Sequence, residues 1–402
     1  MLNRTERSTM KIFIIIGIML SCLLCGSVYA LEPIKVGITT SLSGKYKKFG
    51  TEQYRGVKMW VEDINERGAL LGRPVKLISY DNRSDRETCA SLYEKLITGD
   101  RVDLLIGPYS SGMTLAVRPV VEKYNFPMMV EGTAPSIWEP GVKNMFGIFT
   151  PSEKSMETVF SMAAGKDLKR VALVYAGTDF PRGVAKGVRE EVVRQGMRLV
   201  LDEEYNKEYK TSAEFLSLVK RIKRAKPDIV IVASYLLDSI AFTRQAKSAG
   251  LEPKMLVFTT GPALIEFGNT LGPDAEGIIS TVQWMRSQRM PGSFDFSFRY
   301  KQMYGVNADY NAAGGYAAGQ IIEAAVRLAG SLEIDKVRNQ LKTMKFRSLI
   351  GHYRVDKDGR QIGKPNYIIQ WQEGRRRLIY PENLAQFELV YPFSPWKDRQ
   401  DQ

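Results

Sequence analysis

The segment "IKVGITTSLSG" (34–44), followed by "FGTEQYRGVKMWVEDINERG" (49–68), decides the fold class of this chain. The first piece is an apolar run that stops at hydroxyl residues, which is typical of a buried strand. The second piece carries apolar or aromatic residues at Val57, Trp60 and Ile64, close to the helical period. A buried strand that leads directly into an amphipathic helix predicts the first unit of an α/β domain with a parallel sheet.

The same alternation of strands and helices continues along the chain. "VKLISYD" and "VDLLIG" are strand-like, with a helical segment between them, and after "FGIFTPS" the pattern starts again. Beyond that break, we expect strands at 170–177 and 228–235 and helices at 183–196 and 213–227. Because chains longer than about 250–300 residues usually split into domains, the restart predicts a second lobe.

The N-terminus has the pattern of a secretory signal peptide. Three basic residues precede the apolar run "IFIIIGIMLSCLLCG", which is short for a membrane span of about 20 residues. The small residues Val28 and Ala30 predict cleavage after Ala30. We therefore interpret residues 1–30 as a signal peptide and expect a periplasmic protein.

The cysteines bear on anchoring and on disulfides. Lipid anchoring needs a small-residue motif before Cys22 or Cys25, but "MLS" and "CLL" fit that motif poorly, so we favour export in soluble form. Cleavage of the signal peptide leaves Cys89 alone, and one cysteine forms no internal disulfide. The packed core must therefore hold the protein together.

The net charge of +13 suits an anionic solute or an anionic membrane surface. Basic clusters such as "KRIKRAKPD" (220–228) are explained more simply as solvated helix faces. No zinc-finger spacing or other nucleic-acid-binding motif occurs in the sequence, so we expect no nucleic-acid partner.

The sequence carries no motif of a catalytic site. It lacks the GxxxxGK[ST], HExxH and GxSxG patterns, and its single histidine, His352, has no motif around it that suggests a catalytic triad. Asp81 and Asp85 can be read as metal ligands, but a cap for a helix that begins near Arg86 explains Asp85 better. We expect a protein that is not an enzyme and that uses no cofactor and no metal.

Polar residues follow the expected strands at their carboxyl ends. "LLIGPYSSGMT" (104–114) and "MMVEGTAPS" (128–136) both change from an apolar run to glycine and hydroxyl residues, and 175–180, 233–239 and 259–262 are the equivalent places in the second lobe. Ligands of open α/β sheets bind beyond the carboxyl ends of the strands, where helix N-termini point outward. The sequence therefore predicts a polar cleft between the lobes.

These blocks, together with "YNAAGGYAAGQIIEAAVRLAG" (310–330) and "GHYRVDKDGRQIGKPNYIIQWQEG" (351–374), resemble a known family. It is the periplasmic amino-acid and amide solute-binding proteins, typified by the Leu/Ile/Val-binding protein of ABC importers, with a type I periplasmic-binding fold. The resemblance covers nearly the whole mature chain and implies two Rossmann-like lobes with a ligand cleft between them. The small residues of 310–330 suit close helix packing rather than chemistry.

The resemblance also implies how the chain is divided. Three segments should cross between the lobes, near Phe149 to Ser152, Ser280 to Trp284 and Leu349 to His352. The expected units are the signal peptide 1–30, a first lobe of 31–150 plus 283–349, a second lobe of 151–282 plus 350–380, and a C-terminal tail of 381–402.

Residues of the family's site carry over onto positions of this chain. Ser111, with Ser110 beside it, resembles the serine that holds a ligand carboxylate, although both can simply cap the following helix. Thr133 resembles a threonine on the neighbouring strand end, where the backbone of Gly132 should approach the ligand. Aromatic residues should line the rest of the pocket, and the implied ligand-binding set is Ser110, Ser111, Gly132, Thr133, Phe49, Phe180, Tyr235 and Thr260.

One departure affects the choice of ligand. The amino-acid binders carry an acidic residue in the second lobe for the ligand's ammonium, whereas this chain has "TTGPAL" there, with Thr260 at that place. Asp179, Asp238 or Glu131 can supply the charge from another wall. If none does, the ligand is an aromatic or aliphatic acid without an amine, or an amide, because an unpaired buried ammonium costs several kcal/mol.

The resemblance implies a monomeric receptor that closes on a small amino acid, amide or carboxylate and delivers it to the permease and ATPase subunits of an ABC importer. The alternative is a sensor of the same fold that signals to a membrane regulator.

Overall fold

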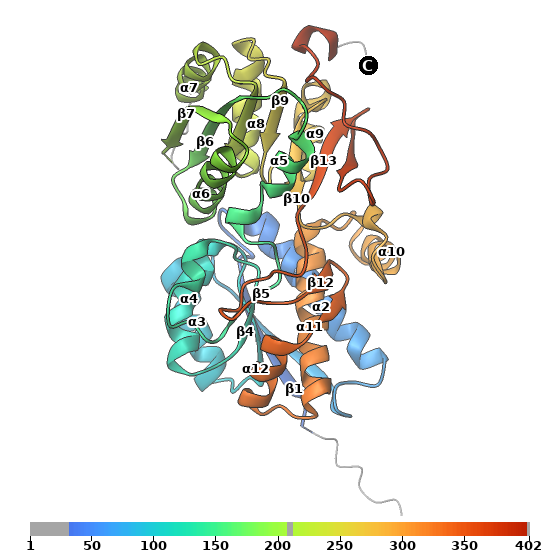
Figure 1. The fold of residues 1–402 in the computed structure, drawn as a ribbon. Coiled ribbons are helices and arrows are strands. Elements are labelled where there is room, and N and C mark those ends of the chain that lie inside the picture. The colour runs from blue at the N-terminus through green and yellow to red at the C-terminus, as the bar shows by residue number, and fades with distance from the viewer. Residues whose placement is uncertain (1–31, 207–211, 400–402) are drawn as a thin grey trace, which may run out of the picture.

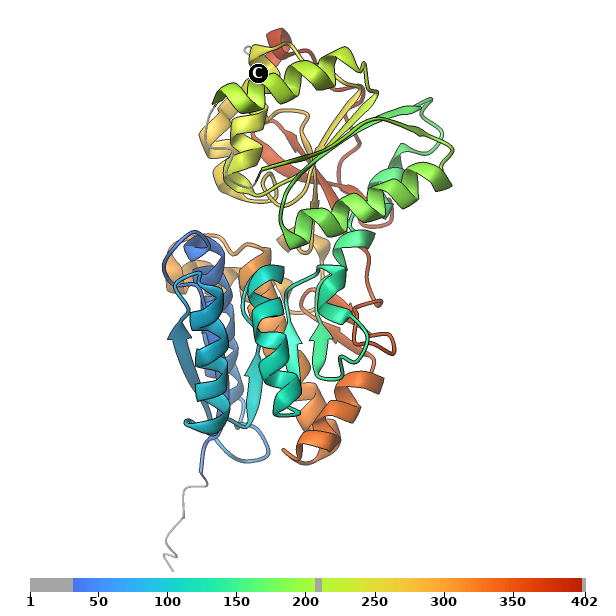
Figure 2. The same ribbon diagram turned by 90° about the vertical axis from the view of Figure 1, so that its left-hand side faces the viewer.

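The computed structural model describes residues 32–206 and 212–399 and shows two lobes, each built on one sheet with helices on both faces (Figures 1 and 2). The predicted α/β class with two Rossmann-like lobes is therefore confirmed. The predicted signal peptide, residues 1–30, lies outside the described residues. Among the residues that are described, no helix has both the length and the apolar character needed to cross a membrane.

The first lobe contains a parallel sheet with the strand order β2-β1-β3-β4-β5. Its strands are β1 (Ile34–Thr40), β2 (Val75–Asp81), β3 (Leu104–Ile106), β4 (Met128–Val130) and β5 (Met145–Gly147). The order reverses between β1 and β3, and such a switch point opens a crevice at the carboxyl edge of the sheet.

The helices of the first lobe form one layer on each face of this sheet. They are α2 (Lys47–Glu66), α3 (Arg86–Thr98), α4 (Ser111–Lys123), α11 (Tyr310–Ala329) and α12 (Ile334–Thr343). Tyr93 of α3 and Val117 of α4 belong to the core on one face, and Trp60 of α2 and Ile321 of α11 to the core on the other. The Asp85 side chain accepts from the Thr88 N–H (2.8 Å), so the expected cap of α3 is confirmed.

The second lobe contains a seven-stranded sheet with the order β14-β13-β10-β9-β8-β6-β7. Its strands are β6 (Arg170–Ala176), β7 (Arg198–Tyr205), β8 (Ile229–Ala233), β9 (Met255–Phe258), β10 (Ile279–Val282), β13 (Tyr367–Gln372) and β14 (Arg375–Tyr380). β6 to β10 pair in parallel, and β13 and β14 are antiparallel additions at one edge.

The helices of the second lobe are α5 (Glu157–Ala163), α6 (Asp179–Arg194), α7 (Ser212–Arg224), α8 (Leu236–Ser248) and α9 (Ile265–Leu271). A further helix, α10 (Ser293–Tyr304), packs Phe296 and Tyr300 into the core of the first lobe. A small hairpin of β11 (Phe346–Ser348) and β12 (Gly351–Tyr353) follows α12.

Two expected boundaries differ from the structure. The third crossing does not lie at Leu349 to His352, because Leu349, Ile350 and Tyr353 are buried in the first-lobe core, where the Tyr353 hydroxyl donates to the Leu341 carbonyl (2.7 Å). The chain stays with the first lobe until about residue 362 and enters the second sheet at β13. The expected division places β11 in the first lobe and β12 in the second, and β12 differs because nothing in its local sequence says which core it packs against.

The expected C-terminal tail is also different. Phe393 and Trp396 are buried in the core of the second lobe, so the described part of residues 381–402 is packed against that lobe. The Trp396 indole N–H donates to the carbonyl of Leu251 (2.8 Å), and the Phe393 N–H donates to the carbonyl of Lys254 (2.9 Å).

The three connections meet in one hydrogen-bonded cluster, which we call the hinge cluster: Thr150, Gln283 and Lys364, one residue from each connection. The Gln283 amide oxygen accepts from the Thr150 N–H (3.1 Å) and from Lys364 Nζ (2.7 Å). The Thr150 hydroxyl donates to the Lys364 carbonyl (3.3 Å). Lys364 is only 6% exposed, and its burial lowers the pKa of the side chain to about 7.

Close packing of α2 on α11 holds the first lobe together. A Cβ atom on Gly56 would lie 1.9 Å from the Ala312 carbonyl oxygen, and one on Gly319 would lie 2.1 Å from the Trp60 indole. Glycine at these positions therefore lets the two helices approach closely, which confirms that the small residues of α11 serve packing.

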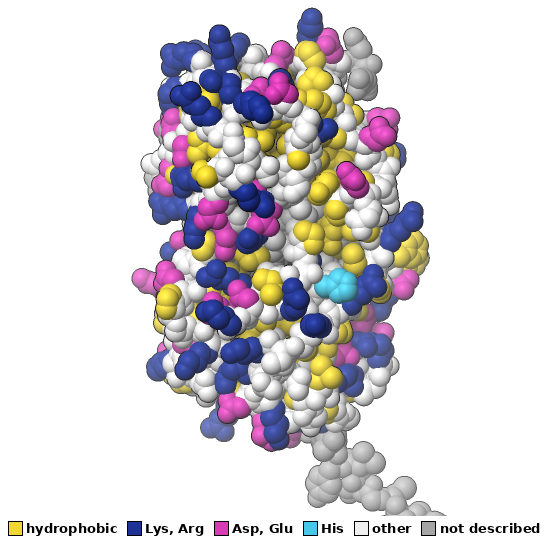
Figure 3. Space-filling view, in the orientation of Figure 1, with side chains coloured by type: hydrophobic (Ala, Val, Ile, Leu, Met, Phe, Trp, Pro, Cys, Tyr) yellow, Lys and Arg dark blue, Asp and Glu magenta, His cyan; other side chains and the backbone are white. Residues whose placement is uncertain are grey.

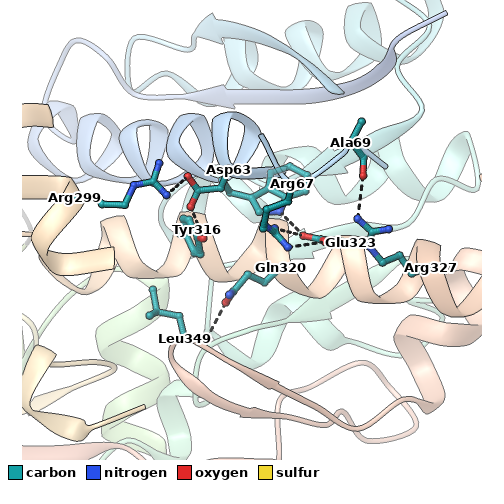
Figure 4. A network of polar contacts seen from close by, with 10 residues as sticks. Asp63, Arg67, Ala69, Arg299, Tyr316, Gln320, Glu323, Arg327 and Leu349 are labelled. Atoms are coloured by element: carbon teal, nitrogen blue, oxygen red, sulfur yellow. Dashed lines mark hydrogen bonds and ion pairs between the residues drawn. The ribbon is translucent and has the colours of Figure 1, made fainter. Parts of the chain in front are cut away.

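Ion pairs and hydrogen bonds flank this helix contact (Figure 4). The Tyr316 hydroxyl donates to Asp63 (2.6 Å), and Arg67 pairs with Glu323 (3.0 Å). Asp63 lies in α2 and Arg67 directly follows it, so both contacts fix the register of α2 against α11.

We predict that Gly56→Ala lowers the free energy of unfolding by about 2 kcal/mol, because the added methyl group overlaps the backbone of α11. Urea unfolding measures the change. Lys58→Ala, on the exposed side of the same helix, is the control and should change the free energy by less than about 0.5 kcal/mol. An equally small effect of Gly56→Ala would contradict the close packing.

We predict that stability depends on the charge of Lys364. The pKa is about 7 in the folded protein and near 10.5 in the unfolded chain, so the unfolded state binds more protons between these values. Stability should therefore rise with pH in this window, on the order of 2 kcal/mol between pH 7 and pH 9. Lys364→Met should remove this part of the rise in urea unfolding, while Lys58→Met should keep it; equal pH dependence in all three proteins would refute the prediction.

Candidate solute-binding cleft

A cavity of about 60 Å³ lies between the carboxyl edges of the two sheets. Because one buried water needs roughly 10–15 Å³ on this measure, the cavity has room for a small solute. Both lobes and all three connections contribute to its wall, which is lined by Tyr109, Ser110, Ser111, Glu131, Thr133, Phe149, Ser155, Phe180, Tyr235, Thr260, Thr281, Val282, Gln283, Tyr310 and Asn366.

Ser111 joins two strand ends of the first lobe. Its Oγ accepts the N–H groups of Thr133 and Ala134, both at 3.0 Å, so the end of β4 is tied to the start of α4. A serine hydroxyl that accepts two hydrogen bonds can still donate its own hydrogen. Ser111 is also the first residue of α4, where N–H groups have no acceptor within the helix and the helix dipole favours an anion.

Ser110 precedes α4 in a strained conformation. Its φ is 78° and its ψ is 146°, a region that glycine occupies far more readily than serine. The Ser110 hydroxyl accepts from the Met113 N–H (3.3 Å), so this serine does cap the helix while it lines the cavity. Strain of this kind is retained where the surrounding structure enforces it, often at binding sites.

Aromatic rings cover the rest of the wall. Tyr109 stacks on Phe49 with 4.7 Å between the ring centroids, and Phe180 lies 5.9 Å from Tyr235 in the second lobe. The ring of Tyr46, from the first lobe, lies 6.4 Å from Tyr235 and joins the lobes at the cleft. Burial raises the pKa values of Tyr109 and Tyr235 well above the ordinary value, so both phenols stay protonated.

The structure brings most of the expected site residues together. Ser110, Ser111, Thr133, Phe180, Tyr235 and Thr260 all line the cavity. Two residues do not line it. Phe49 lies behind Tyr109, and the Cα of Gly132 faces α4, since a Cβ there would meet the Thr114 hydroxyl at 2.6 Å.

Several lining residues were missed by the sequence reasoning. Tyr109 directly precedes the two serines, a signal that was available, whereas Tyr310 comes from the start of α11 and Gln283 and Asn366 come from the connections. Tertiary packing alone brings these three to the cavity. Thr281 and Val282, at the end of β10, and Phe149 and Ser155, near the first connection, complete the missed set. Glu131 also lines the cavity, and the sequence names it as one of three possible partners for a ligand cation.

Three carboxylates were left open as partners for a ligand cation, and only one lines the cavity. Asp179 pairs with Arg86 across the lobes (2.6 Å), and Asp238 accepts from the Tyr205 hydroxyl (2.9 Å). Glu131 lines the cavity and is 6% exposed, and neither of its carboxyl oxygens has a hydrogen-bond partner among the described residues. Burial raises its pKa well above the ordinary value; Asp309 adds to the rise and the Gln53 amide opposes it.

Two ion pairs join the lobes beside the cleft. The Arg86–Asp179 pair joins α3 to α6, and Lys48 of α2 pairs with Glu266 of α9 at 2.7 Å. Both pairs are partly exposed, so each stabilises closure by less than about 1 kcal/mol. Such weak pairs would leave the binding free energy of a ligand as the larger contribution to holding the lobes together.

Two further observations concern other kinds of site. Figure 3 shows Lys and Arg side chains over both lobes on one face, with acidic side chains among them, which is the distribution of solvated helix faces. Within the described ranges, no group of three or more His, Cys, Asp or Glu side chains is placed to hold a metal ion.

Comparison with known proteins agrees with this geometry. Residues 33–376 match the family described as periplasmic binding protein. The Leu/Ile/Val-binding protein homolog 7 of Brucella suis is 24% identical over 398 residues, covering 94% of this chain and 99% of that protein.

Solved structures show the same fold. The substrate-binding protein LivJ from Streptococcus pneumoniae, in complex with isoleucine, has a TM-score of 0.77 at 21% identity and covers 87% of this chain and 100% of its own. A solute-binding protein from R. palustris, in complex with benzoate, has a TM-score of 0.75 at 20% identity, covering 87% and 96%.

The chain thus belongs to the periplasmic binding protein family, and the resemblance to Leu/Ile/Val-binding proteins is confirmed. This family consists of solute-binding proteins and not of enzymes.

We predict that two substitutions of Ser110 have opposite effects on stability. Ser110→Gly should raise the free energy of unfolding by about 1 kcal/mol, because glycine adopts this φ without strain and is nearly as good a cap. Ser110→Ala should lower it by about 1 kcal/mol, because the strain remains and the cap is lost. Urea unfolding of both variants checks this; a decrease in both would mean that the backbone at Ser110 stores no strain.

Proposed function

We propose that this protein is the periplasmic receptor of an ABC importer and that it binds one small amino acid, amide or carboxylate solute between its lobes. The observation that carries the proposal is the position of the cavity, which is walled by residues from both lobes and all three connections. A solute there contacts both lobes only when they are closed, so its binding free energy stabilises the closed form.

The first lobe provides the proposed anion site. The hydroxyls of Ser110, Ser111 and Thr133 surround the start of α4, and a carboxylate placed there needs no buried basic partner. The second lobe contributes Phe180 and Tyr235, whose rings suit the apolar part of a solute.

The closed form is the one that we propose the permease recognises, with export directed by the signal peptide and the receptor acting as a monomer without enzymatic activity. Delivery to permease and ATPase subunits rests on the family to which the chain belongs. Solved structures of similar proteins contain isoleucine and benzoate, so the screen should include both amino acids and aromatic acids.

We predict that Ser111→Ala and Thr133→Val each weaken solute binding by about 1–3 kcal/mol, because each removes a hydroxyl from a charged group. A thermal-shift screen of amino acids, amides and organic acids identifies the solute, and calorimetry on the purified mature protein measures the affinity. Ser91→Ala, on an exposed face of α3, is the control and should bind as the wild type does. Unchanged affinity in the Ser111→Ala, Thr133→Val double variant would remove this wall from the site.

The importer role is tested in cells of the source organism. Deleting the gene should abolish uptake of the identified solute, and the wild-type gene should restore it while the Ser111→Ala gene restores it only at higher solute concentration. Normal uptake combined with a lost response to the solute would instead identify a sensor.

A further inference from the structure

We infer that Glu131 is the specificity-determining residue of the cleft and receives a cationic N–H donor of the solute, so that cation and anion sites both lie on the first lobe. This inference rests on the proposed receptor function and assigns the charge recognition of the same cleft. The second-lobe position at which relatives were expected to carry an acid is occupied by Thr260.

The position of Glu131 places it beside the proposed anion site. Glu131 follows β4, and Thr133 is two residues further along the same strand end. A Cβ on Gly132, between them, would meet the Thr114 side chain of α4, whereas Glu131 lies against α11, where a Cβ on Gly314 would come within 2.9 Å of its Oε1. Glu131 and Thr133 both line the cavity, so one small solute can reach both.

The unpaired atoms of the wall indicate what kind of group the solute must bring. Among the described lining residues, the buried side-chain atoms without a hydrogen-bond partner are both carboxyl oxygens of Glu131, Oδ1 of Asn366 and Oγ of Ser155. All four are oxygens that can accept hydrogen bonds, and the Ser155 hydroxyl can also donate one. A primary ammonium brings three donors, whereas a ligand carboxylate would add only acceptors. Buried acceptors without partners are costly, so the wall selects a donor-rich group.

Among the described residues, none of the groups that shift the pKa of Glu131 is basic. Asp309 and Tyr310 at the start of α11 and Tyr93 of α3 are the titratable groups that interact with it. Lys364, in the third connection, donates to both the carbonyl and the side-chain oxygen of Gln283 (3.2 and 2.7 Å). A cation must therefore come from the solute.

Proton release follows from this arrangement. In the empty cleft burial favours the protonated carboxyl group of Glu131, since it raises the pKa well above the ordinary value. When a solute ammonium binds, the ion pair favours the carboxylate, and the carboxyl proton leaves to solvent. Loading with an amine should thus release up to one proton per solute, and loading with a simple acid should release none.

The test compares solutes that differ only in the amine: L-alanine with propionate, L-valine with isovalerate, and L-phenylalanine with 3-phenylpropionate. Calorimetry at pH 7 in phosphate and in Tris gives the affinity and, from the difference in heat, the protons released. For the pair that binds best, we expect the amine to bind at least tenfold more tightly, with proton release close to one.

Glu131→Gln should reduce this preference to less than about twofold and abolish the proton release. Glu191→Gln is the matched control, because it changes a buried carboxylate that pairs with Arg194 far from the cavity, and it should keep both properties. If Glu131→Gln does not fold, the number of protons that the wild-type protein releases on binding the amine still tests the role of Glu131.

The contrary results separate the two proposals. If the acid without an amine binds as well or better, or if Glu131→Gln keeps the preference, the role of Glu131 is refuted while the receptor function stands. If neither series binds, both proposals fail.

Discussion

The hydrogen bonds from the N–H groups of Thr133 and Ala134 to the Ser111 hydroxyl are the contact on which the cleft depends. They tie the end of β4 to the first turn of α4, so two strand ends present their polar groups to one small volume. The tie adds to the apolar core that α4 and β4 share, and it sets the polar groups of the two ends beside each other. Recognition of an anion by hydroxyls and a helix dipole requires that arrangement, because each such interaction is weak unless its donors converge.

The second constraint is the hinge cluster. Thr150, Gln283 and Lys364 bond the three connections to one another, so the lobes are joined at one place and can separate at the other side of the cleft. Weak, partly exposed ion pairs close the far side. This combination of a buried hinge and a lightly held rim gives a solute control over closure, since the rim pairs by themselves stabilise the closed form little.

Stability and recognition are arranged differently in the two lobes. The first lobe carries the glycine-dependent contact of α2 with α11, the strained Ser110 and the polar strand ends of the cleft. The second lobe contributes mostly rings and a threonine. In the proposed receptor, the charged groups of a solute would therefore face the first lobe and its apolar part would face the second.

Local sequence predicted the parts of the fold that depend on local physics. Strand and helix periods gave the two α/β lobes, and the polar strand ends placed Ser110, Ser111, Thr133, Phe180, Tyr235 and Thr260 at one cleft, because carboxyl ends of parallel strands share an edge. The lobe of β12 and the packing of Phe393 and Trp396 were not predictable in this way. Their short apolar segments fit either core, and the choice depends on which surface is left uncovered.

By itself the sequence determined the class of fold, the pairing of two lobes and the polar character of the strand ends, since these follow from the period of apolar residues and from the chemistry of strand-to-helix turns. Only the tertiary structure decided which of three carboxylates faces the cavity. The sequence does not distinguish Asp179, Asp238 and Glu131. In the structure Arg86 and Tyr205 contact the first two, whereas Glu131 is buried beside α11 with no basic or hydroxyl group bonded to it among the described residues. A charge acquires its role from its surroundings, and those surroundings come from parts of the chain distant in sequence.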